Sequence, residues 1–162
     1  MSQMSDLPER VVRTVAELKA LEGQEISVSD WVEITQDRVN AFANATGDHQ
    51  YIHVDPERAK DTFFGGTIAH GYLTLSLIPY LGSLSRGVKV ELGGKMAVNY
   101  GLNRVRFPAP VRVGRRIRMR TRLVSVEEID GRAVQLTHLR TIEVEGEEKP
   151  ACVAETIGRI YF

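Results

Sequence analysis

The chain has 162 residues, enough for one domain with a full hydrophobic core. Lys plus Arg (21) equals Asp plus Glu (21), so the charge balance indicates neither a nucleic-acid partner nor an acidic one. The single cysteine, Cys152, excludes an internal disulfide framework and fits a reducing compartment. The first residues lack the pattern of a secretory signal, and the most apolar stretch is too short to cross a bilayer. We therefore expect a cytoplasmic protein without a membrane segment.

The first half of the chain has mainly helical patterns. Residues 12–21 carry apolar side chains at helical spacing, and an extended segment is expected over residues 26–34. Thr35 is a suitable N-cap for a second helix, which Gly47 should end. Pro56 suits the first turn of a further short helix.

A fourth helix is expected in the stretch GYLTLSLIPYLGSL, residues 71–84. Its side chains leave almost no polar face, and a helix of this kind is buried on most sides. Pro79 removes a backbone hydrogen bond, so it should kink this helix or begin its end.

The second half of the chain changes to a period of two residues, which is typical of strands. Strands are expected over residues 96–107, 116–129, 133–144 and 150–161, and Asp130-Gly131 predicts a tight hairpin between the middle two. Helices followed by strands favour an α+β fold, with a curved antiparallel sheet wrapped around the apolar helix. We expect a helical arm over residues 1–20 and a single domain over residues 21–162.

Asp48 and His53 lie five residues apart in the stretch GDHQYIH, residues 47–53. An imidazole can donate or accept a proton near neutral pH, and a nearby carboxylate can orient a water or take its proton. The pair could therefore perform acid–base catalysis. The spacing fits equally well with Asp48 capping a turn and His53 packing beneath the next helix.

His70 and Gly71 precede the apolar helix. Backbone N–H groups at a helix start have no intrahelical acceptor, and a glycine lets a ligand oxygen approach them closely. The two residues could therefore stabilise negative charge that develops on a carbonyl oxygen. Alternatively, the glycines of FFGGTIAHG serve only a tight turn into close packing.

The arginines of residues 104–122 could contact phosphates or could line the solvent face of a strand. His49 and His138 have no evident partners. The sequence contains neither a Cys/His cluster nor an HExxH motif, so no metal site is expected.

Three separated blocks resemble the MaoC-like dehydratases, which include (R)-specific enoyl-CoA hydratases and NodN-like proteins. The blocks are ITQDRVNAFANATGDHQYIHVDPERA, FGGTIAHGYLTLSLIP and NYGLNRVRFPAPVRVG. The resemblance runs from about Leu21 to the C-terminus and implies the hot-dog fold, usually as a dimer. Many hydratases carry Asn-Pro where this chain has Gln50-Tyr51, a version that resembles the NodN-like branch.

The resemblance implies that Asp48 and His53 are catalytic, and that Gly71, beside His70, meets the thioester oxygen. The implied reaction is reversible syn addition of water to a trans-2-enoyl-CoA, which gives an (R)-3-hydroxyacyl-CoA. Coenzyme A would be part of the substrate, no separate cofactor is implied, and a homodimer is expected. A hot-dog acyl-CoA thioesterase and a non-catalytic acyl-CoA-binding module are the alternatives.

Overall fold

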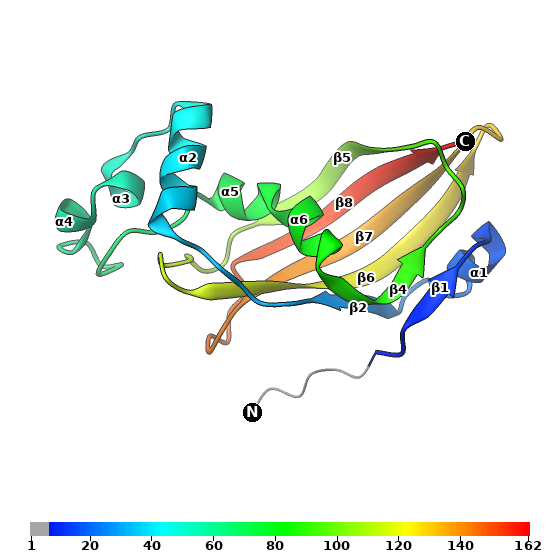
Figure 1. Ribbon diagram of the computed structural model, residues 1–162, viewed down its shortest axis with the longest axis horizontal. Coiled ribbons are helices and arrows are strands. Elements are labelled where there is room, and N and C mark those ends of the chain that lie inside the picture. The colour runs from blue at the N-terminus through cyan, green and yellow to red at the C-terminus, as the bar shows by residue number, and fades with distance from the viewer. Residues whose placement is uncertain (1–6) are drawn as a thin grey trace.

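The structure of the protein is a computed structural model that describes residues 7–162. One curved sheet dominates it, with two short helices across the strands and three more beyond one end (Figure 1). This arrangement confirms the expected α+β class. The predicted arm over residues 1–20 falls in part on residues 1–6, which lie outside the described residues.

The described residues contain six helices and eight strands. The helices are α1 (Val15–Lys19), α2 (Gln36–Thr46), α3 (Tyr51–Val54), α4 (Pro56–Ala59), α5 (Gly71–Ser76) and α6 (Ile78–Ser83). The strands are β1 (Arg10–Val12), β2 (Glu25–Ser29), β3 (Val32–Glu33), β4 (Ser85–Val90), β5 (Met96–Arg106), β6 (Arg116–Ile129), β7 (Ala133–Val144) and β8 (Cys152–Tyr161).

The sheet runs in the order β1-β4-β2-β6-β7-β8-β5, with β3 paired to β6. All neighbours are antiparallel except β1 and β4, which are parallel. The expected antiparallel sheet is therefore extended by one parallel strand pair. The predicted hairpin lies between β6 and β7, where Asp130 and Gly131 both have positive φ, of 48° and 64°.

The apolar helix is divided into α5 and α6 at Leu77, and Pro79 lies in the first turn of α6. Leu73, Leu77 and Leu81 are buried against the sheet. Tyr72 and Tyr80 are 70% and 44% exposed, so the prediction of burial on most sides was wrong for one face. None of the helices in residues 7–162 has the length and apolar character needed to cross a bilayer.

The N-terminal helix is shorter than residues 12–21. Thr14 and Glu17 form a capping box, which starts α1 at Val15, and the preceding residues pair with β4 as a strand instead. Strand β4 itself was not expected, because its residues follow the apolar helix without a clear turn signal.

Two hydrophobic clusters fill the sheet face beneath the helices, which we call the inner face. The α5 cluster includes Leu73, Leu77, Leu81, Ile117, Met119, Ile142, Val144, Cys152 and Ala154. The α1 cluster includes Val12, Leu18, Leu21, Ile26, Leu123, Val126, Val134 and Leu136. Cys152 is fully buried, as expected, and burial raises the pKa of its thiol to about 11.

The arginines of β6 lie on the opposite, outer face, where carboxylates neutralise them. Arg116 pairs with Glu145, Arg118 with Glu143, and Arg120 with both Glu143 and Glu25. Arg118 is also buried over the ring of Trp31. These arginines therefore stabilise a sheet surface, and β6 is an interior strand, so they do not protect a sheet edge.

Candidate active site

Asp48 follows the C-terminus of α2. Thr35 caps the N-terminus of this helix, and Gly47 ends it with a φ of 80°, as the sequence predicted. The Asp48 side chain is 51% exposed, and its Oδ1 accepts a hydrogen bond from the backbone N–H of Gln50 at 3.3 Å. The carboxylate is therefore held beside the chain but remains open to solvent or a ligand.

His53 lies in α3, a one-turn helix that the sequence did not predict. Its side chain is buried, and its Nδ1 donates a hydrogen bond to the carbonyl of Ile68 at 2.7 Å. Because a carbonyl can only accept, the neutral ring carries its proton on Nδ1 and leaves a lone pair on Nε2.

The surroundings of His53 favour the neutral imidazole. Burial lowers its pKa below the ordinary value of 6.5, although the hydrogen bond to Ile68 acts in the opposite direction. The neighbouring His70 lowers this pKa further, and the charge of Asp48 raises it. His53 is therefore able to accept a proton at neutral pH.

His70 connects the two predicted catalytic residues. Its Nε2 donates to the backbone carbonyl of Asp48 at 3.0 Å, and its ring stacks on that of His53 with centroids 3.8 Å apart. It is only 3% exposed, and its Nδ1 has no hydrogen-bond partner among residues 7–162. The Asp48 carboxylate is 4.0 Å from His70 Nε2, so the ring proton goes to the backbone carbonyl instead.

Gly71 is the first residue of α5, so its N–H has no intrahelical acceptor. A Cβ placed on Gly71 would lie 3.1 Å from the ring of Phe107. The absence of a side chain on Gly71 therefore leaves room for the Phe107 ring to pack against the start of α5.

Asp48, His53 and His70 each offer one ligand-type atom, and these atoms lie within 4.8 Å of one another. One water can span such a gap, because each of its hydrogen bonds reaches about 2.8 Å. The same group could hold a metal ion, since a carboxylate and two imidazoles are suitable ligands. The fold thus brings together Asp48 and His53 from one motif and His70 from the other, and Gly71 follows His70 directly in the chain.

Gln36 supports the site and was missed by the sequence analysis. Its Nε2 donates to the His53 carbonyl at 2.7 Å, and its Oε1 accepts from the hydroxyl of Thr67 at 2.6 Å. It thereby ties α2 to α3 and to the segment before α5. No local pattern identifies a residue whose partners lie 17 and 31 positions further along the chain.

His49 takes no part in this cluster. It is exposed, and its Nε2 contacts the Asn44 side chain at 3.0 Å. His138 is buried on β7, far from this loop in sequence, and contacts Arg140.

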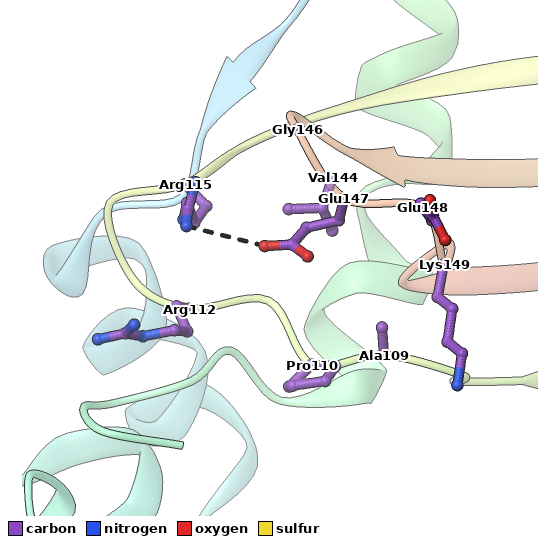
Figure 2. Close-up of a pocket in the computed structure, with 9 residues that line it drawn as sticks. All are labelled: Ala109, Pro110, Arg112, Arg115, Val144, Gly146, Glu147, Glu148 and Lys149. Atoms are coloured by element: carbon purple, nitrogen blue, oxygen red, sulfur yellow. Dashed lines mark ion pairs between the residues drawn. The ribbon is translucent and has the colours of Figure 1, made fainter. Parts of the chain in front are cut away.

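A separate cleft of about 420 Å³ lies between the β7–β8 turn and the loop before β6 (Figure 2). It contains none of the four site residues, and Arg115 pairs with Glu147 across it at 3.7 Å. The guanidinium of Arg112 points away from the cleft and donates to the carbonyl of Gly65 (Figure 2). The cleft therefore does not gather its positive charges around a phosphate.

Known proteins resemble this chain along most of its length. A family model described as "MaoC like domain" matches residues 17–145. The chain is 57% identical over 150 residues to 3-hydroxyacyl-thioester dehydratase Z of Mycobacterium tuberculosis, a match that covers 93% of this chain and 97% of that protein. It is 41% identical over 160 residues to Nodulation protein N of Rhizobium leguminosarum bv. viciae, covering 98% and 91% of the two chains.

A solved structure of an (R)-hydratase has a similar fold. The (R)-hydratase of A. caviae, involved in PHA biosynthesis, superposes with a TM-score of 0.66 at 26% identity, covering 85% of this chain and 98% of that one. The hot-dog architecture expected from the sequence is thereby confirmed. Because the family match spans most of the chain and a close relative aligns almost end to end, the chain belongs to the MaoC-like family of dehydratases.

Proposed function

We propose that this protein is an (R)-specific enoyl-CoA hydratase, which adds water reversibly and in syn fashion to a trans-2-enoyl thioester to give an (R)-3-hydroxyacyl thioester. The observation that carries the proposal is the grouping of Asp48, His53 and His70 within 4.8 Å, with one open carboxylate and one imidazole lone pair. The names of the relatives, a 3-hydroxyacyl-thioester dehydratase and an (R)-hydratase, support the same chemistry.

Water is a poor nucleophile, so the proposed mechanism begins with its activation. Asp48 and His53 Nε2 hold one water, and a proton leaves this water as its oxygen bonds to Cβ of the enoyl group. The electron pair of the double bond moves toward the thioester carbonyl, and Cα then takes a proton from the Asp48–His53 pair. The net change adds H to Cα and OH to Cβ, so the reaction needs no electron carrier.

The thioester oxygen gains negative charge as the enolate forms. We assign its stabilisation to the N–H of Gly71, which has no acceptor within α5. His70 belongs to the same substrate site through its contacts. It holds the carbonyl of Asp48 and stacks on His53, so it would position both groups for the substrate.

We further propose that the protein acts as a homodimer. Strand β5 ends the sheet, and its outward backbone groups have no strand beside them in residues 7–162. Met96, Tyr100 and Leu102 on this strand are each about half exposed, at 55%, 55% and 49%. A long exposed edge of this kind favours pairing with a second copy of the chain.

The cytoplasmic location and the boundary between the arm and the domain stay predictions from the sequence.

The test is steady-state hydration of crotonyl-CoA by the purified protein, followed by loss of enoyl absorbance and by chiral analysis of the product. We expect turnover to the (R) product. The rate should be the same with and without EDTA, because the proposed mechanism uses no metal ion. Release of free CoA thiol would indicate a thioesterase instead. Binding of crotonyl-CoA without turnover would indicate a binding module.

A further inference from the structure

A polar band crosses the inner face of the sheet between the two hydrophobic clusters. Alternate residues of β7 point inward, and those near its two ends belong to the α1 and α5 clusters. Between them, on the same face, lie His138 and Arg140. Thr121 on β6 lies opposite Arg140, and Thr156 on β8 lies opposite His138. The other two residues in register with them, Leu123 and Ala154, are apolar. Apolar side chains at these inward positions would make the core continuous. The presence of polar side chains there therefore needs an explanation other than core packing.

Arg140 carries a charge that nothing nearby neutralises. Its Nη1 donates to the hydroxyl of Thr121 at 2.7 Å, its Nε to that of Thr156 at 3.4 Å, and its Nη2 to His138 Nδ1 at 3.3 Å. It forms no ion pair with any residue of the described range 7–162. Burial lowers the pKa of this guanidinium to about 10, which leaves it charged at neutral pH. An uncompensated charge that is largely withdrawn from water is costly.

The polar groups of Arg140 and His138 that remain without a partner are N–H donors. A guanidinium has five N–H groups, and three of them are used. His138 accepts on Nδ1, so its neutral ring carries a proton on Nε2. Burial, together with the charge of Arg140, lowers the pKa of His138 to about 3 and keeps it neutral. A group with only acceptors, such as a carboxylate, would match these donors.

The band is not fully enclosed by the protein. Thr156 and Arg140 are only partly buried. The next inward position on β8 is Gly158, where an added Cβ would meet only the carbonyl of Val98, at 3.6 Å. The missing side chain therefore leaves space beside Thr156.

The band also borders the helix that begins at the candidate active site. Arg140 pairs with Ala154, a member of the α5 cluster, and α5 packs on β8 while α6 packs on β6. Residues 71–83 span roughly 20 Å at the rise of an α-helix. An acyl chain whose thioester lies at Gly71 and which follows α5 and α6 would approach the band. The distance along these helices is similar to the length of a fatty acyl group.

We propose that Arg140 binds a carboxylate at the far end of the acyl chain, so that the preferred substrates are thioesters of dicarboxylic enoyl acids. This inference rests on the proposed hydratase function. Arg140 would act as a specificity-determining residue, with Thr121, Thr156 and His138 holding its guanidinium in place.

The test compares two trans-2-enoyl-CoA substrates with the same number of carbons, one ending in a methyl group and one in a carboxylate. The wild-type protein should have a kcat/KM about tenfold or more higher for the carboxylate, the size expected of a charge-assisted hydrogen bond. Arg140→Gln should abolish this preference. Arg122→Gln, on the outer face of β6, is the matched control and should keep both the preference and the rate.

Several outcomes would overturn the proposal. Equal rates of the wild-type protein with both substrates would do so without any variant, even if Arg140→Gln failed to fold. An unchanged preference in Arg140→Gln would also do so. Inhibition by free glutarate that depends on Arg140, without a preference between the substrates, would assign the site to a free anion instead. Absence of turnover with crotonyl-CoA would contradict the hydratase function itself, which separates the two failures.

Discussion

At the scale of single residues, Asp48 combines an open carboxylate with a fixed backbone. Asp48→Asn preserves the carbonyl that His70 holds but removes the charge and the basicity, so the fold should remain intact. Turnover of crotonyl-CoA should fall by about 10²–10⁴-fold, as is typical for loss of a general acid–base group. Circular dichroism and melting temperature report the fold, and Asp61→Asn, an exposed carboxylate between α4 and α5, is the control. Full activity of Asp48→Asn would remove Asp48 from the mechanism.

The lowered pKa of His53 leads to a prediction for how kcat/KM of the hydration depends on pH. Because burial lowers its pKa below 6.5, the imidazole loses its proton at a lower pH than an exposed histidine does. The base is therefore available at neutral pH, and kcat/KM should fall only as pH drops through this lowered pKa. A pH–rate profile checks the sign. A limb with an apparent pKa above 6.5 would show that His53 does not act as the neutral base.

The two residues also show how far local spacing can predict a site. An aspartate and a histidine five residues apart fit a catalytic pair and a capped turn equally well. The features that distinguish His53 come from distant parts of the chain, because Ile68 determines its tautomer and Gln36 holds its carbonyl. In the sequence, only the resemblance of three blocks to a known family predicts that Asp48, His53 and Gly71 belong to one site.

At the scale of elements, the start of α5 depends on a glycine. Gly71→Ala should change stability little, since alanine favours helices by up to about 1 kcal/mol while its methyl group crowds the Phe107 ring. The Phe107 ring must shift to admit this methyl group, which disturbs the surroundings of the Gly71 N–H, so kcat/KM should fall by about 10²-fold or more. Gly82→Ala in α6 is the matched control, because a Cβ there meets nothing within 4 Å. Equal activity of the two variants would remove Gly71 from oxyanion binding.

Elements with local signals were predicted well, and those held by distant contacts were not. Helix α2 has its cap at Thr35 and its stop at Gly47 within its own sequence, and both were identified. Helix α3 has no side-chain cap, and the carbonyl of Ile52 in it accepts from the N–H of Ile68 instead. Strand β4 similarly exists through pairing with β1 and β2, which the local pattern of residues 85–90 does not reveal.

At the scale of the whole molecule, the change from helical to alternating periodicity was enough to predict the α+β class and a sheet beneath an apolar helix. It could not predict that the core is divided. Arg140 and His138 occupy inward positions of β7, and simple alternation assigns such positions to apolar packing. A residue that departs from the apolar and polar alternation of its own strand is a good candidate for a functional role.

The exposed edge of β5 gives the final prediction. A dimer that pairs through this edge should elute with twice the chain mass of 18.1 kDa in size-exclusion chromatography with light scattering. Leu102→Lys combined with Met96→Lys adds charges that oppose edge pairing, so the double variant should shift toward the monomer. Val124→Lys is the control, because Val124 is a similarly exposed apolar residue on the interior strand β6. A wild-type monomer, or a double variant that stays dimeric, would show that β5 is not the interface.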